Sequence, residues 1–442
     1  MSSARTVAER VLTRVWISDA FAAAVLAAEI SRMADFDPRD TALATELIYG
    51  VLRTQRALET RLRSMTNTGR IDLAPAPRAQ LLMAAYSILF LDRIPAFAAV
   101  NEAVAAIDDK RVASFVNAIL RQLASHVESR GRPSLSGAIA ESVPGWLRGA
   151  LRKSLGRRDA EAFLTAEPPP IGLSLRMSED RAAWISELRK ACPNATFEEG
   201  KVSPRAILVW GAGDVRRLPG AGKAWIVQEE GAQVVALALG ARSGERVLDA
   251  CAGRGNKTWI LTDAVGQTGA VDAADLYASK LERLREAPCG DAVRQTFVVD
   301  WSIENQTKAM PPRDYDRVLV DAPCSGTGTL RRRPEIALHR SADDVTRLSE
   351  LQVTLVRHAA LHVKPGGKLV YAVCSVLREE AEGVVEKLVG QPLGHGMTLS
   401  PNPFDSESLP VLVPEGVTAM RLLPHVHGTD GYFLASFEVK QS

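Results

Sequence analysis

Apolar residues recur at helical spacing through the first 130 or so residues of the chain. Leu43, Leu47, Ile48, Val51, Leu52 and Leu58 form one stripe, and Leu81, Leu82, Ala85, Tyr86, Leu89 and Phe90 form a second. Stripes with this period are typical of amphipathic helices that bury one face. Pro38, Pro75 and Pro95 stand near the expected helix starts, where proline is tolerated. The pattern predicts an all-helical domain of roughly six or seven helices over residues 1–130.

The pattern changes between residues 131 and 240. A turn-rich stretch precedes a helical pattern at 146–164, and three consecutive prolines at 168–170 then favour an extended spacer. We therefore expect 131–170 to be a helical connector. Short strand-like segments follow at 171–176, 206–209 and 224–227, and they alternate with helical ones such as 181–190. This alternation predicts a small α+β, RRM-like module over residues 171–240.

Over residues 241–442, short apolar runs alternate with helical patterns. The runs that resemble buried strands are 246–250, 270–274, 296–299, 317–320 and 368–373. Strands that alternate with helices are typical of a doubly wound, Rossmann-like parallel sheet. A turn with glycines at 428 and 431 leads into a last apolar run, 432–439, which we expect to join the sheet antiparallel. The predicted fold class is therefore α/β in this part, preceded by the α+β module and the all-α domain.

The composition agrees with a globular protein of more than one domain. The chain has 442 residues, too many for one ordinary hydrophobic core, and 46% of them are hydrophobic and 24% charged. Because no apolar run approaches the length of a membrane span, we expect a soluble, cytoplasmic protein with no membrane partner. The net charge of +2, with arginine-rich stretches such as 331–333, is compatible with a polyanionic partner such as RNA.

The cysteines indicate a reactive site. The chain has five, at 192, 251, 289, 324 and 374, and their irregular spacing indicates neither a metal site nor a disulfide scaffold. We expect no metal and a reducing compartment. Cys324 and Cys374 each follow a strand-like run and precede a serine. Since ligands bind at the carboxyl ends of strands in open α/β sheets, the two thiols are predicted to meet in a nucleophilic site. Two buried core cysteines are the alternative.

Residues 251–257, Cys-Ala-Gly-Arg-Gly-Asn-Lys, form a glycine-rich turn between a predicted strand and a predicted helix. Such a turn lets a ligand approach bare backbone, and the helix start favours negative groups. A phosphate-binding P-loop would need glycine in place of Asn256, and a dinucleotide fingerprint would need a third glycine where Trp259 and Leu261 stand. S-adenosylmethionine is the remaining candidate ligand, and a purely structural turn is the alternative.

Aspartates follow the next three predicted strands, at Asp275, Asp300 and Asp321. A carboxylate at Asp275 can accept hydrogen bonds from both ribose hydroxyls of a nucleoside, and Asp300 is well placed for an adenine edge. Each aspartate by itself is more often a solvated loop residue or a helix cap. Together they favour a cofactor that carries a nucleoside.

Segments at both ends of the chain resemble the RsmB/Sun family of RNA cytosine-C5 methyltransferases, whose N-terminal domain is NusB-like. In the C-terminal part the matching segments are 321–328 (DAPCSGTG), 332–334 (RRP), 371–375 (YAVCS) and 428–431 (GTDG). In the N-terminal part they are 49–53 (YGVLR), 91–95 (LDRIP), 100–104 (VNEAV) and 115–121 (FVNAILR). The family's cofactor loop normally reads Cys-Ala-Ala-Pro-Gly-Gly-Lys, and Arg254 and Asn256 are notable departures from it.

The resemblance implies a class I methyltransferase sheet and S-adenosylmethionine-dependent methylation of cytosine C5 in RNA, preferably ribosomal RNA, through a covalent cysteine–C6 adduct. Cys374 matches the nucleophile, Cys324 the second cysteine that assists release, and Asp321 the residue beside the N3 edge of the base. Lys257 would line the pocket. The implied cofactor-binding residues are Cys251, Ala252, Gly253, Arg254, Gly255, Asn256, Lys257, Asp275, Asp300 and Asp321.

The two departures act differently. Arg254 places bulk and positive charge beside a cofactor that already carries a sulfonium. Asn256 is expected to preserve the turn, because asparagine tolerates left-handed backbone better than other residues with a side chain.

The NusB-like domain is expected to add RNA-binding surface, with bracing of the catalytic domain as the alternative. The arginines at 331–333 are candidates to hold phosphates that flank the target base. The sequence alone leaves three alternative functions: a catalytically weakened RNA-binding or ribosome-assembly factor, a tRNA methyltransferase, and an oxidoreductase with the same type of sheet. The two strand-end cysteines argue against the oxidoreductase.

Overall fold

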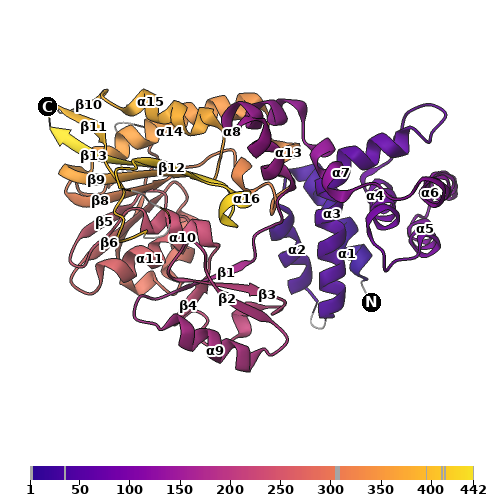
Figure 1. Ribbon diagram of the computed structural model, residues 1–442, viewed down its shortest axis with the longest axis horizontal. Coiled ribbons are helices and arrows are strands. Elements are labelled where there is room, and N and C mark those ends of the chain that lie inside the picture. The colour runs from indigo at the N-terminus through magenta and orange to yellow at the C-terminus, as the bar shows by residue number, and fades with distance from the viewer. Residues whose placement is uncertain are drawn as a thin grey trace. The chain divides into compact units, whose positions relative to one another are not determined.

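The computed structural model describes residues 3–33, 36–303, 309–394, 396–409, 412 and 415–441 (Figure 1). Contacts between Cα atoms divide the chain into two compact units. The first, here called the helical unit, comprises Met1–Gly149, Arg157–Ala166 and Leu330–Arg340. The second, here called the sheet unit, comprises Ala150–Gly156, Glu167–Thr329 and Ser341–Ser442.

The helical unit begins with six helices over the region in which helical periodicity predicts them. They are α1 (Ala4–Ser18), α2 (Ala22–Ser31), α3 (Pro38–Arg63), α4 (Pro75–Phe90), α5 (Ala96–Ala105) and α6 (Lys110–Arg130). Pro38 and Pro75 are the first residues of α3 and α4, and Pro95 caps α5. Helix α4 contacts α1, α3, α5 and α6, and its residues 79–89 are all buried. A helix that is apolar on every side is a core helix, so α4 is the centre of this unit.

Three further helices follow in the chain: α7 (Leu135–Ser142), α8 (Gly145–Thr165) and the short α13 (Ile336–His339). Gly156 interrupts α8 with a left-handed backbone, φ 79°. The two units therefore share α8, since Ala150–Gly156 belong to the sheet unit and Arg157–Ala166 to the helical unit.

A small antiparallel sheet opens the sheet unit, in the strand order β2-β3-β1-β4. Its strands are β1 (Ile171–Leu175), β2 (Thr196–Glu199), β3 (Ala206–Trp210) and β4 (Trp225–Val227), and helix α9 (Arg181–Ala191) packs against β2 and β3. Three of these strands and the helix lie where the sequence predicts them. Strand β2 was not predicted, because only Phe197 of its four residues is buried and the apolar signal is correspondingly short.

The large sheet has the strand order β10-β11-β13-β9-β8-β5-β6-β7, with β12 paired to β13. Its parallel strands are β5 (Arg246–Asp249), β6 (Ala270–Asp275), β7 (Val293–Val298), β8 (Tyr315–Asp321) and β9 (Val363–Val373). Strand β13 (Tyr432–Gln441) runs antiparallel to β9, as predicted. The antiparallel edge also contains β10 (Pro392–Gly394), β11 (Met397–Pro401) and β12 (Ala419–Leu422), which the sequence did not indicate. The predicted fold class, α/β after all-α and α+β parts, is confirmed.

Alternate strand residues point to opposite faces of the large sheet, and each face is covered by different helices. Val318, Val320 and Tyr371 belong to a core with residues of α14 (Ala342–Ala360) and α15 (Glu382–Leu388). Leu319 and Val370 belong to a second core with α10 (Glu230–Leu237) and α11 (Asn256–Val265). Figure 1 shows these two pairs of helices on opposite sides of the strands. The parallel strands are therefore buried on both faces, which explains their nearly continuous apolar runs.

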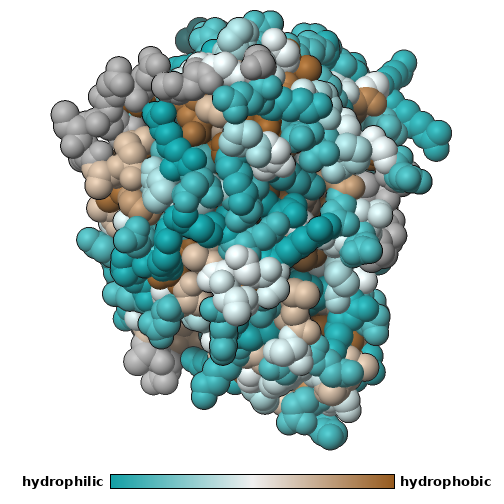
Figure 2. Space-filling model, turned by 90° about the vertical axis from the view of Figure 1, so that its left-hand side faces the viewer, coloured by the Kyte–Doolittle hydropathy of each residue, from teal (hydrophilic) through white to brown (hydrophobic). Residues whose placement is uncertain are grey.

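The surface is polar on the face that Figure 2 presents, where teal residues predominate and brown ones are scattered among them. Among helices in the described ranges, none combines the length and the apolar character that crossing a membrane requires.

Candidate active site

The order of the strands defines a switch point between β5 and β8. From β5 the chain proceeds outward to β6 and β7, and it then returns to place β8 and β9 on the other side of β5. Ligands of open α/β sheets bind outside the carboxyl ends of the strands at such a reversal. The glycine-rich turn follows β5, and Asp321 is the last residue of β8. The fold therefore brings the predicted site residues to the edge at which ligands bind.

The two cysteines predicted to meet are in contact. Cys324 follows β8, Cys374 follows β9, and their Sγ atoms are 3.3 Å apart. The register explains this contact, because Asp321 and Ala372 are paired residues of the two strands. Both cysteines are partly exposed, unlike the buried Cys289. The hydrogen bond with Cys374, together with burial, raises the pKa of the Cys324 thiol well above its usual value. Cys324 is therefore a neutral thiol that can donate a hydrogen bond to the Cys374 sulfur.

An ion pair lies at the same edge. Lys257 Nζ, from the first turn of α11, is 2.5 Å from Asp321 Oδ2. Burial acts to lower the pKa of Lys257, but the charge and hydrogen bond of Asp321, with a contribution from Cys374, raise it above its ordinary value. The ammonium therefore stays charged near neutral pH, paired with the Asp321 carboxylate.

The glycine-rich turn contains two left-handed residues, Gly253 (φ 58°) and Gly255 (φ 91°). Asn256 is the first residue of α11 and not a left-handed one, so the reason expected for its tolerance was wrong. The turn persists because both left-handed positions are still glycine. Arg254, between them, is exposed, and Ala252 N–H donates to the carbonyl of Ala274 in β6. Cys251 is partly buried, and burial raises the pKa of its thiol.

Asp275 connects this turn to the end of β6. Its carboxylate accepts hydrogen bonds from Gly253 N–H and Tyr277 N–H, both at 3.0 Å, and lies 3.2 Å from Lys280 Nζ. Asp300 lies beyond the end of β7, where it accepts hydrogen bonds from the backbone and hydroxyl of Ser302. The three predicted acidic residues therefore lie at or just beyond the ends of their strands: Asp275 ends β6, Asp321 ends β8, and Asp300 lies past β7, held in its own loop.

Asp249, the last residue of β5, was not predicted as a site residue. It is fully buried and accepts a hydrogen bond from Thr258 Oγ1 of α11 at 2.8 Å. Burial raises its pKa to about 7, against the opposing effects of Thr258 and Lys257. The bond ties the strand to the helix on either side of the glycine turn. The available signal was an acidic residue inside an apolar run, directly before the turn.

Backbone hydrogen bonds connect Cys374 to Gly328, and Gly328 to the glycine turn at residues 428–431. Gly328 N–H donates to the carbonyl of Cys374 at 3.0 Å, and Gly431 N–H donates to the carbonyl of Gly328 at 2.9 Å. A Cβ atom at position 328 would lie 1.9 Å from the carbonyl oxygen of Gly431 and 2.9 Å from that of Cys374. The backbone on both sides is therefore too close for any side chain at this position.

We expect Gly328→Ala to destabilise the protein by about 3 kcal/mol or more, because rigid backbone cannot move away cheaply. Denaturant unfolding measures this, with Gly149→Ala as the matched control, since a Cβ there meets nothing within 4 Å. An unfolding midpoint for Gly328→Ala equal to that of the wild type would contradict the close approach described here.

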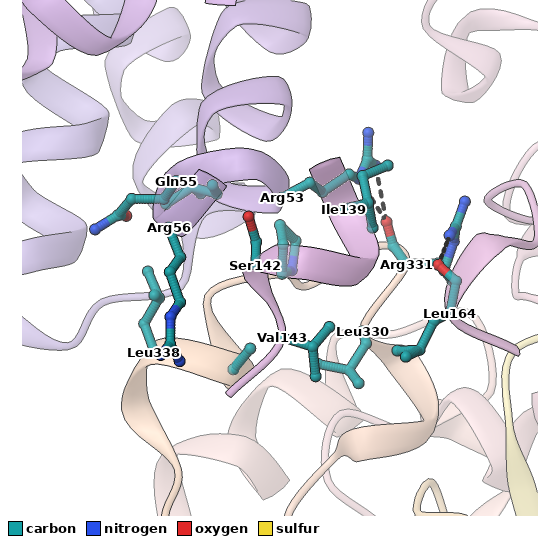
Figure 3. A pocket seen from close by; sticks show the side chains of 13 residues that line it. Arg53, Gln55, Arg56, Ile139, Ser142, Val143, Leu164, Leu330, Arg331 and Leu338 are labelled. Carbon is teal, nitrogen blue, oxygen red and sulfur yellow. Dashed lines mark hydrogen bonds between the residues drawn. The ribbon is translucent and has the colours of Figure 1, made fainter. Parts of the chain in front are cut away.

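The arginines at 331–333 do not behave as one group. Arg331 is only 7% exposed, its guanidinium donates to the carbonyl of Leu164, and its own carbonyl accepts two hydrogen bonds from Arg53 (Figure 3). It is thus a structural residue of the helical unit, whereas Arg332 and Arg333 are exposed. The adjoining cavity is lined by residues of the helical unit, Val143 and Leu330 among them, and holds about 40 Å³, far too little for a nucleoside.

Within the described residues, no group of three or more His, Cys, Asp or Glu side chains is arranged to hold a metal ion.

Comparisons with known proteins identify the family of the chain. The model of the family "16S rRNA methyltransferase RsmB/F" matches residues 236–438, and that of the NusB family matches residues 2–125. The chain is 30% identical over 456 residues to the "probable ribosomal RNA small subunit methyltransferase B" of Bacillus subtilis, covering 99% of each chain. It is 33% identical over 411 residues to the ribosomal RNA small subunit methyltransferase B of Xanthomonas campestris, covering 89% of this chain and 90% of the relative.

Solved structures share the fold. The crystal structure of PH0851 superposes with a TM-score of 0.77 at 23% identity, covering 98% of each chain. NSun6 from Pyrococcus horikoshii superposes with a TM-score of 0.52 at 17% identity, covering 67% of this chain and 98% of that one. The resemblance found in the sequence motifs is thereby confirmed: the chain belongs to the RsmB/F family of ribosomal RNA methyltransferases and carries the NusB-like region at its N-terminus.

Proposed function

We propose that this protein transfers the methyl group of S-adenosylmethionine to C5 of a cytosine in small-subunit ribosomal RNA, through a temporary bond between Cys374 and C6. The observation that carries the proposal is the contact of two thiols, 3.3 Å apart, at the edge that also holds the Lys257–Asp321 ion pair. The choice of ribosomal RNA rests on the names of the relatives, and tRNA is the alternative substrate.

The chemistry needs a nucleophile because C5 of cytosine reacts poorly with a methyl donor by itself. Addition of the Cys374 thiolate to C6 forms a C–S bond and moves electron density to C5, which can then attack an electrophilic methyl group. Charge that develops at N3 during addition must be neutralised. Lys257 Nζ is the donor available for N3, and Asp321 can accept a hydrogen bond from the exocyclic amine of the base.

Release requires transfer of the C5 proton to a water molecule. The electron pair of that C–H bond re-forms the C5–C6 double bond, and the C–S electron pair returns to the sulfur of Cys374. Cys324 is the group suited to assist this step, because its neutral thiol can donate a hydrogen bond to the departing sulfur. That bond stabilises Cys374 as a leaving group. The two cysteines are therefore assigned different steps, one bond formation and the other bond cleavage.

The residues at the glycine turn fit S-adenosylmethionine, which when bound supplies an electrophilic methyl group on a sulfonium. Gly253 offers bare backbone, since even an added Cβ would meet nothing within 4 Å. The first amides of α11 suit the carboxylate of the ligand, and Asp275 beside the turn suits a ribose diol. The acidic side chains at this edge also favour the positive sulfonium. Arg254, between the two glycines, is exposed.

Asp275→Ala is expected to weaken binding of S-adenosylmethionine by about 1.5–3 kcal/mol, roughly tenfold to a hundredfold in affinity, because a charge-assisted bidentate contact is lost. Titration calorimetry with the purified protein measures the change. Asp291→Ala is the control, since Asp291 is exposed in the connection between β6 and β7. Unchanged affinity in Asp275→Ala would mean that this carboxylate only holds the backbone of its own loops and does not contact the cofactor.

The activity itself is tested by incubating the protein with isotopically labelled S-adenosylmethionine and either small-subunit ribosomal RNA or tRNA. We expect label in 5-methylcytidine from the ribosomal RNA after digestion to nucleosides and mass spectrometry. Absence of cofactor binding by calorimetry would instead favour the alternative of a non-catalytic RNA-binding or assembly factor.

A further inference from the structure

The serine that follows each of the two cysteines belongs to one buried hydrogen-bond network. Ser325 Oγ lies 3.4 Å from Ser375 Oγ, and Thr327 Oγ1 lies 3.2 Å from the former and 3.0 Å from the latter. All three side chains are buried. Hydrogen bonds therefore connect the loop after β8 to the loop after β9 at the residues next to Cys324 and Cys374.

Glu380, in the short helix η4 (Arg378–Glu380), anchors this network. It is 0% exposed, and its carboxylate accepts hydrogen bonds from both the backbone N–H and the hydroxyl of Ser325, the former at 2.8 Å. Gln352 Nε2 of α14 donates to the same carboxylate at 3.0 Å and to the carbonyl of Pro323 at 2.9 Å. Both residues on either side of Cys324 are thus held by groups that depend on Glu380.

Glu380 is also close in sequence to the other cysteine, Cys374. Glu380 lies six residues after Cys374, and its own carbonyl accepts a hydrogen bond from Tyr371 Oη of β9 at 2.7 Å. Tyr371 Oη also approaches Gln352 Oε1 at 2.9 Å. Among the described residues, no lysine or arginine forms a salt bridge with Glu380, and its carboxylate accepts hydrogen bonds from Ser325 in the loop after β8 and from Gln352 of α14. A buried carboxylate held only by hydrogen-bond donors fixes those donors in place, because leaving it unpaired is costly.

We propose that Glu380 is a positioning residue that holds the Cys324 thiol against Cys374, an assignment that rests on the proposed function of the two cysteines. Glu380 acts on the loop of Cys324 through its hydrogen bonds with Ser325 and Gln352. Its loss should therefore impair the steps that need both thiols together and leave the binding of cofactor and RNA unaffected.

The first test is Glu380→Gln, which keeps the shape of the side chain. The amide oxygen can still accept from Ser325 N–H, but the NH₂ group now faces the Ser325 hydroxyl. That hydroxyl must change from donor to acceptor, and the negative charge that held its donors is lost. We expect the turnover rate to fall roughly tenfold or more, with dissociation constants for S-adenosylmethionine and RNA within about twofold of the wild type. Glu379→Gln is the matched control: it removes the adjacent carboxylate, which pairs with Lys153 at the surface, and should leave turnover unchanged.

The second test measures the position of the thiols without catalysis. Diamide oxidises two adjacent thiols to a disulfide: two protons and two electrons pass to its N=N bond, which becomes a hydrazine. The Cys324–Cys374 pair, at 3.3 Å, should close rapidly in the wild type and in Glu379→Gln, and roughly tenfold more slowly in Glu380→Gln. Peptide mapping without reductant gives the rate. Ser325→Ala, which removes only the hydroxyl donor, should also slow closure and serves if Glu380→Gln does not fold.

The outcomes separate the two proposals. If the wild type methylates no RNA, the proposed function fails, whereas the rates of disulfide closure still decide the role of Glu380. If closure and turnover in both Glu380→Gln and Ser325→Ala equal those of the wild type, Glu380 does not position the thiols and the inference is overturned.

Discussion

Replacing Cys374 with alanine should abolish both methylation and any covalent RNA–protein complex, whereas replacing Cys324 should cause that complex to accumulate. Cys374→Ala removes the sulfur that bonds to C6. Cys324→Ala leaves attack and methyl transfer possible but removes the hydrogen bond to the leaving sulfur, which lies 3.3 Å away. Both variants should stay folded, because loss of one partly exposed sulfur typically costs no more than about 1–2 kcal/mol.

Denaturing electrophoresis of each variant after incubation with S-adenosylmethionine and ribosomal RNA measures the complex. Cys192→Ala is the control, since Cys192 lies at the end of α9 in the small antiparallel sheet region and should behave as the wild type. A complex formed by Cys374→Ala but not by Cys324→Ala would exchange the two assigned roles. Full activity in either variant would contradict the two-cysteine mechanism.

Asp321→Asn should lower kcat/KM by about a hundredfold or more, because it removes the ion-pair partner of Lys257, the donor proposed for N3. The change breaks an ion pair of 2.5 Å and replaces the acceptor proposed for the exocyclic amine of the base. It also takes from Lys257 the partner that keeps its pKa raised against burial. Initial rates of methylation at several RNA concentrations give kcat and KM separately.

A matched pair in the same sheet provides the control for this substitution. Asp316, also in β8, pairs with Lys364 of β9 near the other end of the strands. Asp316→Asn removes a carboxylate of the same kind at the opposite edge, and we expect the rate of methylation to stay within about twofold of the wild type. Equal losses of methylation rate in the two variants would mean that Asp321 stabilises the sheet and does not contact the target cytosine.

The sequence predicted the features that are encoded locally. The five parallel strands were evident because strands buried on both faces are apolar runs, and the glycine turn was evident because Gly253 and Gly255 adopt backbone that favours glycine. The meeting of Cys324 and Cys374 also followed, since both end neighbouring parallel strands. For the strands and the turn a short stretch of chain carries the whole signal, whereas the cysteine contact follows from two such stretches 50 residues apart.

The parts that were missed depend on partners far apart in the chain. Glu380 lies 55 residues from Ser325 and 28 from Gln352, and nothing near any of the three indicates that they meet. Strands β10, β11 and β12, on the antiparallel side of the sheet, are short and have few buried residues, so they carry little periodic signal. Arg331 illustrates the converse error, because a run of three arginines indicates a charged surface although its first member is buried.

The central claim is tested most directly by bisulfite sequencing of RNA from cells that lack the gene, compared with the same cells carrying the wild-type or the Cys374→Ala gene. Methylated cytosine resists bisulfite, so the account predicts one cytosine of the small-subunit ribosomal RNA that is protected with the wild-type gene and converted in the other two. Protection that is unchanged by loss of the gene, or that is lost from tRNA instead, would contradict it.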